Sequence, residues 1–214
     1  YPGEPESCYT NDAADLEADQ SSGEELTGGI AFNSFLYLFT PNACYKWSFG
    51  DVPLNGRIDL TEERGMLNPR AYCRFENQMA VMDRAGIYLF NGGNANPISN
   101  VVSNWMDQNV VWDNSAWFHA AAYPAEETVK FFVCLDGSRY PRHSICFNYR
   151  TLRWWWEEYP WEIGASATVP IASRRELIVG GENERVLLHD HQADVPTQDR
   201  ELDARYILTS ATYT

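Results

Sequence analysis

The segment FENQMAVMDRAGIYLFNGGNANPIS, from Phe75 to Ser99, decides the predicted fold. Its first apolar run, Met79–Met82, is followed by the Asp-led turn 83–86, in which Gly86 is free to take positive φ. Ile87–Phe90 form the return strand, and an Asn-Gly-Gly sequence ends it. Short apolar runs with turn residues at both ends are typical of strands covered on both faces. The segment therefore predicts a hairpin at the centre of a stacked sheet.

The same pattern recurs along the chain. A shift of 43 residues aligns Phe32–Trp47 without a gap, so that Phe32 matches Phe75. A third copy opens at Tyr123, 48 residues beyond Phe75, and a fourth covers Glu176–His189. A period in the forties that contains strands alone favours propeller blades. We therefore predict an all-β, β-propeller-like fold with about four recognisable blades of antiparallel strands and one short helix. The competing interpretation is an antiparallel sandwich whose hairpins look alike by chance.

Composition divides the chain into three parts. Residues 1–27 hold eight acids and no Lys or Arg, and we interpret them as an acidic extended arm. Residues 28–192 form the predicted propeller-like domain, within which 51–66 is expected to be a connecting segment. Residues 193–214 are predicted to be a C-terminal strand segment that leads toward a further domain.

One stretch between the second and third blades favours a helix. Ser99 is expected to cap it. Its apolar face would consist of Val101, Val102, Trp105 and Met106.

Bulk properties exclude several classes of protein. The net charge of −14 opposes tight binding to nucleic acid, because that requires cations at the phosphates. The five cysteines are irregularly spaced and predict no disulfide framework, and Cys44 is expected to be a small core residue. No apolar run approaches the length of a membrane span.

A tryptophan-rich strand and an arginine-containing loop are the candidate contact surfaces. The run Trp154–Trp156 with Trp161 suits either packing, including a subunit interface, or stacking against sugar rings, and we favour packing. Strand alternation would place Trp155 on one face and its two neighbours on the other. The insertion 139–143 is expected to project as a loop. The candidate interface or glycan contacts are Trp154, Trp156, Trp161, Arg139 and Arg142.

The sequence predicts no catalytic, cofactor-binding or metal-binding residues. His189 and His191 would face the same way on a strand, as in some zinc sites, but a third ligand is not evident. The other two histidines, at positions 119 and 143, are expected at the surface or in turns. The acid pairs 126–127 and 157–158 are interpreted as solvated charge beside turns. Motifs for a nucleophile elbow, a phosphate-binding loop or a dinucleotide site are absent, so we predict that the chain is not an enzyme.

Three parts of the chain, in this order, resemble a known family. They are Gly28–Ile30 with Phe35–Phe39, then Met82–Gly92 with Pro97–Ser99, then 177–190. Together they resemble the β-propeller region of tail nozzle proteins of tailed phages, also called tail tubular or head-to-tail stabilisation proteins. Members of that family are much longer, so the chain would be either a fragment or a compact relative.

The resemblance implies a structural virion protein of the phage tail, assembled in the host cytoplasm. Several copies would form a ring below the portal and adaptor proteins, and DNA would pass along the axis without sequence-specific binding. The alternative is a carbohydrate- or receptor-binding propeller, such as a lectin or a tail-tip adhesin. A glycan-active enzyme is the third possibility.

Overall fold

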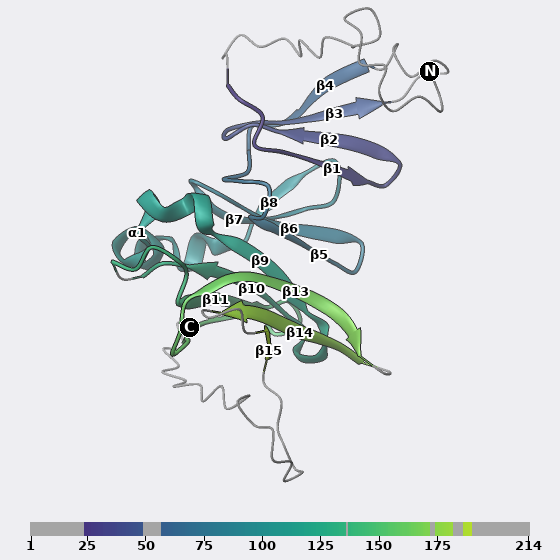
Figure 1. The fold of residues 1–214 in the computed structure, drawn as a ribbon. Helices are drawn as coiled ribbons and strands as arrows, with labels where there is room; N and C mark the ends of the chain where they lie inside the picture. Colours follow the sequence, from purple (N-terminus) through teal and green to yellow (C-terminus); the bar gives the residue numbers. More distant parts are fainter. Residues whose placement is uncertain (1–23, 49–56, 136, 172–173, 182–185, 190–214) are drawn as a thin grey trace, which may run out of the picture.

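The computed structural model describes residues 24–48, 57–135, 137–171, 174–181 and 186–189. These residues form four antiparallel sheets in chain order, which we call blades 1 to 4 (Figure 1). Blade 1 contains β1 (Gly28–Phe32), β2 (Phe35–Phe39), β3 (Cys44–Ser48) and β4 (Arg57–Glu62). Blade 2 contains β5 (Tyr72–Phe75), β6 (Gln78–Asp83), β7 (Gly86–Phe90) and β8 (Ala95–Pro97). Blade 3 contains β9 (His119–Tyr123), β10 (Thr128–Val133), β11 (His143–Asn148) and β12 (Arg153–Glu158). Blade 4 contains β13 (Ile163–Ile171), β14 (Arg174–Gly181) and β15 (Val186–Leu188).

The helical segments are short and lie mostly between blades 2 and 3. They are η2 (Ser99–Val101), α1 (Ser103–Asn109), η3 (Trp112–Trp117) and η4 (Pro124–Glu126). The predicted fold class, all-β with propeller-like blades and one short α-helix, is confirmed. Each blade is a meander of sequential neighbours, so the described chain has four separate sheets instead of the two of a sandwich.

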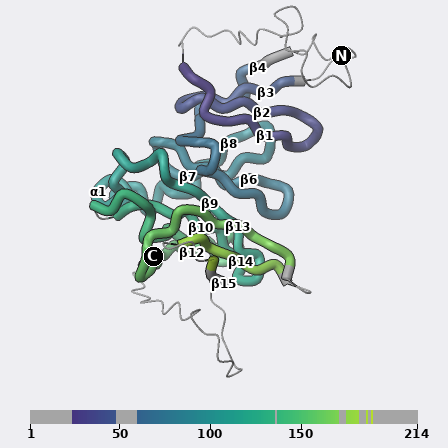
Figure 2. The backbone as a smooth tube through the Cα atoms, in the orientation of Figure 1, coloured from purple at the N-terminus to yellow at the C-terminus, as the bar shows by residue number. Residues whose placement is uncertain are grey.

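The blades are stacked as an open arc. In Figures 1 and 2, blade 1 lies at one end of the column, blade 4 lies at the other, and blades 2 and 3 lie between them. The first strands of successive blades are neighbours, because β9 packs beside both β5 and β13. Arg74 of β5 also donates a hydrogen bond to the carbonyl of Ala31 in β1. This arrangement places the first strands along one side, as in a propeller.

The repeat seen in the sequence corresponds to equivalent positions in the blades. Phe32, Phe75 and Tyr123 each end the first strand of their blade. The aligned copies therefore began at the ends of β1, β5 and β9, and the alignment missed most of each first strand. The predicted central hairpin is confirmed as β6 and β7, in which Asp83 pairs with Gly86 at a φ of 125°.

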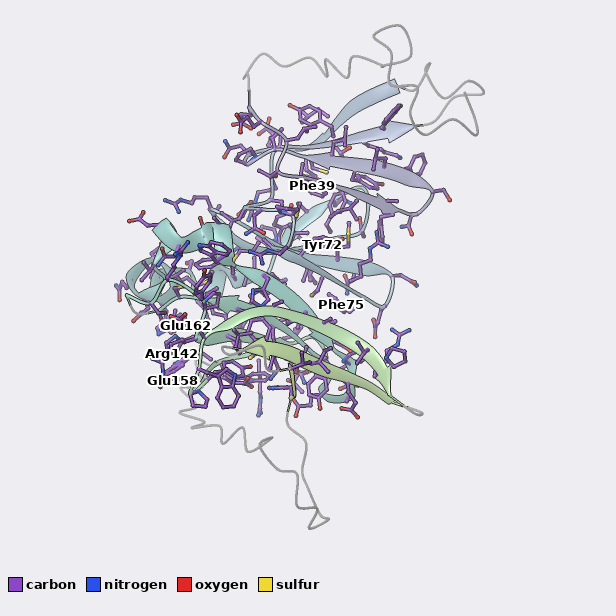
Figure 3. All side chains as sticks on the ribbon, viewed as in Figure 1. Phe39, Tyr72, Phe75, Arg142, Glu158 and Glu162 are labelled. Carbon is purple, nitrogen blue, oxygen red and sulfur yellow. The ribbon has the colours of Figure 1, made fainter. Side chains whose placement is uncertain are left out.

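Aromatic side chains fill the spaces between blades. Tyr37 of blade 1 meets Phe90 of blade 2 edge-on, with 5.1 Å between ring centroids. Phe75 of blade 2 stacks on Tyr149 of blade 3 at 4.7 Å. Figure 3 shows side chains filling the layers between the sheets, with Phe39 and Phe75 among those labelled. Burying each such ring contributes roughly 1.5–3 kcal/mol of transfer free energy, so the contacts between blades hold the arc together.

Two local predictions need correction. The segment 51–66 is more than a connection, because it contains the edge strand β4. Ser99 does not cap a helix: its hydroxyl accepts a hydrogen bond from the Ile87 amide at 2.8 Å, and η2 begins at this residue. Val101 is 75% exposed, whereas Val102 and Met106 are buried as predicted.

The cysteine prediction is confirmed for the described residues. Cys44, Cys73, Cys134 and Cys146 are free and buried. Burial raises the pKa of the Cys44 and Cys73 thiols, so both side chains behave as small apolar groups. The acidic arm up to residue 23, His191 and the C-terminal strand segment lie outside the described residues.

Candidate functional site

The tryptophan-rich segment is strand β12, the outer strand of blade 3, and most of its aromatic surface is in internal contacts. Trp154 is 3% exposed and packs on Phe147, with ring centroids 4.6 Å apart. Trp156 stacks on Trp105 of α1 at 6.5 Å, with its ring also near His143. Trp155 points to the opposite face, as strand alternation predicts, and donates its indole N–H to Glu157. Trp161 lies after the strand, half-buried, against Gly181.

The two candidate arginines occupy different environments in the segment before β11. Arg139 is exposed, and its guanidinium carbon lies 5.6 Å from the Trp117 ring centroid. Arg142 is half-buried, and its carbonyl accepts a hydrogen bond from the Tyr159 amide at 2.8 Å. Figure 3 labels it at the same edge as Glu158 and Glu162.

The loop that contains these arginines does not project as a whole. The carbonyl of Pro141 accepts a hydrogen bond from the Ile163 amide at 2.7 Å, which ties the loop to blade 4. His143 at its end is buried in β11. The structure therefore brings the three neighbouring tryptophans together on one strand and leaves the two arginines apart from that strand's aromatic faces.

A buried ion pair lies between blades 3 and 4, where the sequence predicted none. The Lys130 ammonium in β10 is 2.8 Å from both carboxylate oxygens of Glu157 in β12. The two side chains are 1% and 6% exposed. The prediction that the acid pair 157–158 is solvated is wrong for Glu157, because the side chains of blade 4 cover this face of blade 3.

Glu157 receives additional hydrogen bonds from three neutral donors. The Trp155 indole donates at 2.9 Å, the Tyr159 hydroxyl at 3.0 Å and the Ser144 hydroxyl at 3.3 Å. We call Lys130, Ser144, Trp155, Glu157 and Tyr159 the interblade polar cluster. A carboxylate with this many donors is well compensated for the loss of water.

The cluster holds its charges at neutral pH. Burial alone would raise the pKa of Glu157, but the adjacent Lys130 ammonium and the hydrogen bonds lower it to about 2. Burial opposes the charged form of Lys130 as well. The Glu157 carboxylate faces Lys130, and its negative charge outweighs the effect of burial, so the pKa of Lys130 is raised. The buried Cys146 thiol keeps its proton and adds no charge here. The side chains of the cluster therefore form a buried ion pair with satisfied hydrogen bonds, and none of them changes its protonation state near pH 7.

The histidines at this junction are buried and neutral. Desolvation lowers the pKa of His119 to about 4 and that of His189 to about 3, with nearby positive charge adding to both effects. His119 stacks on Phe132 at 4.7 Å, and His189 meets Tyr123 edge-on at 5.3 Å. The prediction of surface or turn histidines is wrong for positions 119 and 143, which are buried in strands β9 and β11. His189 lies in a turn, as predicted, although its side chain is buried. Within the described ranges, no group of three His, Cys, Asp or Glu side chains is placed to bind a metal ion.

The acid pair 126–127 agrees better with the prediction of solvated charge beside a turn. Glu127 is exposed and lies 3.4 Å from Arg150, which also pairs with the exposed Glu76 at 2.6 Å. Exposed pairs of this kind stabilise a fold by less than about 1 kcal/mol.

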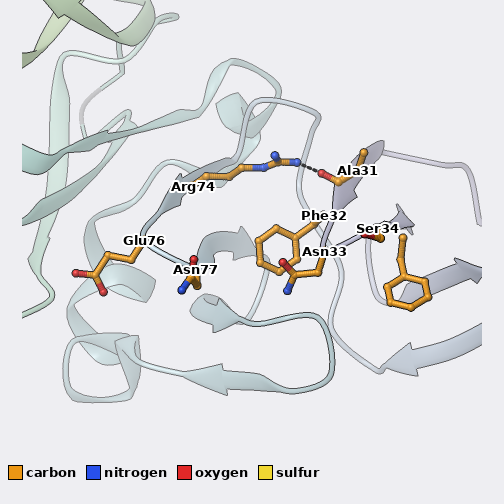
Figure 4. A pocket seen from close by; sticks show the side chains of 8 residues that line it. Ala31, Phe32, Asn33, Ser34, Arg74, Glu76 and Asn77 are labelled. Atoms are coloured by element: carbon orange, nitrogen blue, oxygen red, sulfur yellow. Dashed lines mark hydrogen bonds between the residues drawn. The ribbon is translucent and has the colours of Figure 1, made fainter.

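An open pocket of about 520 Å³ lies where the turns of blades 1 and 2 meet (Figure 4). It is lined by Ala31, Phe32, Asn33, Ser34, Phe35, Arg74, Glu76 and Asn77. Arg74 crosses the pocket to the Ala31 carbonyl, and the Lys46 ammonium lies 3.6 Å from the centroid of the Phe35 ring. The amide and carboxylate groups suit sugar hydroxyls, but one face of the Phe35 ring is already occupied by Lys46.

A second, smaller pocket of about 250 Å³ follows the first strands of blades 2, 3 and 4. Its lining includes Tyr72 and Arg74 of β5, residues 120–122 of β9 and residues 166–168 of β13. The polar side chains here are few, and Thr168 donates its hydroxyl to the Ala122 carbonyl. This pocket is a packing feature between first strands.

Sequence reasoning missed the interblade polar cluster, although one signal was present. Lys130 is the one charged residue in the apolar run Val129–Val133, and a lone charge in a buried strand needs a partner. The identity of that partner depends on strand pairing, since Glu157 lies two strands away in the same sheet.

Comparison with known proteins adds no assignment: the sequence matches no protein-family model and no curated protein. Among the described residues, every helix is too short or too polar to cross a membrane.

Proposed function

We propose that this chain is a structural virion protein of a tailed phage, a component of the tail nozzle or head-to-tail connector that forms part of the DNA conduit. The observation that supports it most is the open arc of four stacked blades. An arc of stacked sheets has terminal faces and edges with no neighbour among the described residues, and such surfaces suit assembly with other copies.

The chemistry of the described residues favours a scaffold over a catalyst. The most buried charges pair with each other in the interblade polar cluster, and Glu157 has a full set of donors. The aromatic face of β12 packs inside the chain. The side chains that looked most reactive therefore contribute to stability, and the work of the protein is done through its surfaces.

The charge of the chain agrees with a conduit for DNA. A net charge of −14 repels phosphates, so DNA would pass without being held.

The test is the mass and shape of the protein in solution, measured by light scattering with negative-stain microscopy at low and high salt. We expect a ring of several copies, or addition of the protein to a partner ring. A monomer that shows no self-association at any salt concentration or protein concentration tested, and that joins no portal or adaptor ring, contradicts the proposal.

The alternative, a carbohydrate- or receptor-binding propeller, is favoured by the pocket in Figure 4. Because Trp154 is buried, a glycan site is better placed at Asn33, Glu76 and Asn77 than on β12. Glycan-array binding that is lost in Asn77→Ala and kept in Asn104→Ala, an exposed residue of α1, would support this alternative. Absence of array binding would count against it.

A further inference from the structure

Three arginines gather around η3, a short helix that carries two tryptophans. The guanidinium carbon of Arg84 lies 5.5 Å from the ring centroid of Trp112. Those of Arg70 and Arg139 lie 5.8 and 5.6 Å from the ring centroid of Trp117. We call these five residues the arginine–tryptophan patch. Cation–π contacts of this kind align guanidinium groups along aromatic faces without neutralising their charge.

The surroundings of η3 fix the patch in place. Asn68 donates its side-chain amide to the carbonyls of Ser115 and Phe118, at 2.8 and 2.9 Å. Asn114 donates to the Ser138 carbonyl at 2.8 Å, which joins η3 to the loop that carries Arg139. The patch is therefore assembled by the fold from segments far apart in the sequence, and little ordering would be required when a partner binds.

The charges of the patch are not compensated by acids of the described chain. Arg70 donates to the carbonyls of Gly164 and Ala116, and Arg84 donates to the Trp112 carbonyl. Within the described ranges, none of the three arginines has a carboxylate oxygen within 4.0 Å. Other cations of the chain do have such partners, as Arg64 does with Asp83 and Arg150 with Glu76.

The patch is accessible as well as positive. Arg84 and Arg139 are exposed, and both tryptophans are half-buried. Asp113 is the one acid between residues 110 and 120. A chain with a net charge of −14 therefore presents three guanidinium groups beside aromatic surface, none of them paired with a carboxylate of the described residues. Guanidinium groups bind carboxylates through paired N–H donors, so a carboxylate-rich peptide is the chemistry that fits.

The acidic arm has the complementary charge. Its first 23 residues contain six acids and no Lys or Arg. We propose that the arginine–tryptophan patch of one copy binds residues 1–23 of a second copy. This inference rests on the proposed function, because it assigns a contact to the self-assembly proposed there. Nucleic acid is disfavoured as the occupant because the net charge of the chain repels a phosphate backbone.

The position of residue 24 favours a contact between copies over one within the chain. The Glu24 carboxylate accepts a hydrogen bond from Asn42 in blade 1, at one end of the arc. The patch is built from residues that follow β4, β6, α1 and β10, so its members belong to blades 2 and 3 and the segments beside them, whereas Asn42 belongs to blade 1. In a head-to-tail assembly, the blade 1 end of one copy would lie against its neighbour, which would bring the arm of one copy within reach of the patch of the next.

The direct test measures binding of a fluorescent peptide of residues 1–23 to the full chain at low ionic strength. The six acids of the chain's own arm are changed to Asn or Gln to remove competition. We expect Arg84→Gln/Arg139→Gln to weaken peptide binding about tenfold, since each lost exposed ion pair accounts for a few-fold. Arg153→Gln removes an exposed arginine on β12 outside the patch and should bind as the parent does. Circular dichroism checks that each variant is folded.

Three results would overturn the proposal. They are equal peptide binding by the patch variant and the parent, equal binding of a peptide whose acids are neutralised, and tighter binding of a single-stranded DNA oligonucleotide than of the peptide. The mass of the chain should rise with protein concentration, and an equal rise after the six acids of the arm are neutralised would mean that the arm makes no contact between copies, which also contradicts it. Peptide binding by a chain that forms dimers or open chains but no ring refutes the ring and not the patch, whereas a ring without peptide binding refutes the patch alone.

Discussion

Replacing Lys130 with methionine tests how much the interblade polar cluster contributes to the stability of blade 3 beneath blade 4. Methionine keeps most of the length and packing of the lysine stem and removes the ammonium. Glu157 would then keep its hydrogen bonds to Ser144, Trp155 and Tyr159, and would lose both 2.8 Å contacts to the cation. A carboxylate that is 6% exposed would carry an uncompensated charge.

The expected loss is large, because breaking a buried ion pair by removing one partner costs about 3–5 kcal/mol in unfolding free energy. Glu157→Gln should cost a similar amount, since it leaves the Lys130 ammonium buried without a counter-charge. The double variant carries no buried charge. Its amide oxygen can still accept from Trp155, and its amide N–H can donate to the hydroxyl of Tyr159 or Ser144 in place of the second carboxylate oxygen. We expect it to lie within about 2 kcal/mol of the parent, because replacing both partners of a buried pair is often close to neutral.

Urea unfolding of the parent, both single variants and the double variant completes a double-mutant cycle. From the values above, the coupling free energy should be at least about 4 kcal/mol. The reasoning is refuted if Lys130→Met costs less than about 1 kcal/mol or if the two single losses simply add in the double variant.

The pH dependence of the single variant gives an independent check with a definite sign. In the parent, the pKa of Glu157 is lowered from 4.5 to about 2, so its contribution to stability is present above pH 4.5 and is lost as pH falls toward 2. In Lys130→Met, burial without the cation should raise that pKa above its unfolded value, so the folded state takes up a proton first. The stability difference between variant and parent should therefore shrink as pH falls from 7 toward 4.5. A difference that grows over this range contradicts the ionic assignment.

Three further predictions concern single residues. The pKa of His119 is about 4 in the folded chain and 6.5 when unfolded, so His119 should lower stability by up to about 1.4 kcal/mol per pH unit as pH drops from 6.5 to 4. His189 adds a slope of the same sign, so His119→Leu should reduce the total slope in urea titrations at several pH values by the His119 share. Gly65→Ala should lower the thermal midpoint by the equivalent of about 1–3 kcal/mol, because its methyl group would meet backbone atoms of Thr40 and Pro41 in the turn between β2 and β3, whereas Gly164→Ala, with open space around it, should have little effect. Ser99→Ala should cost about 1–3 kcal/mol in urea unfolding by leaving a buried β7 amide without an acceptor, while Ser103→Ala at the start of α1 should cost well under 1 kcal/mol.

The repeat was predictable because its signals are local. Apolar runs of four to six residues between turn residues mark β6, β7 and β10 in any context. By contrast, β4 reads RIDLTE, an alternating and partly charged sequence typical of an edge strand, and it resembled a connection. The prediction that Ser99 caps a helix was also wrong, because its hydroxyl accepts a hydrogen bond from β7, and that contact depends on β7 lying beside η2.

The candidate site residues were predicted less well than the fold. Alternation correctly separated Trp155 from Trp154 and Trp156, since the period of two is a property of any strand. Nothing in the local sequence distinguished the buried Glu157 from the half-buried Glu158. The difference arises because blade 4 packs on one face of β12 and leaves the other face to α1 and its neighbours.

The sequence by itself determined the all-β class, the four repeats, the central hairpin and the buried character of Cys44, because each follows from the chemistry of neighbouring residues along one strand or turn. Only the tertiary structure decided that Lys130 pairs with Glu157, that His119 is buried and that three arginines meet around η3. Those outcomes depend on which faces of which blades come into contact. That contact is set by the summed packing of many side chains distant in sequence, and no short segment encodes it.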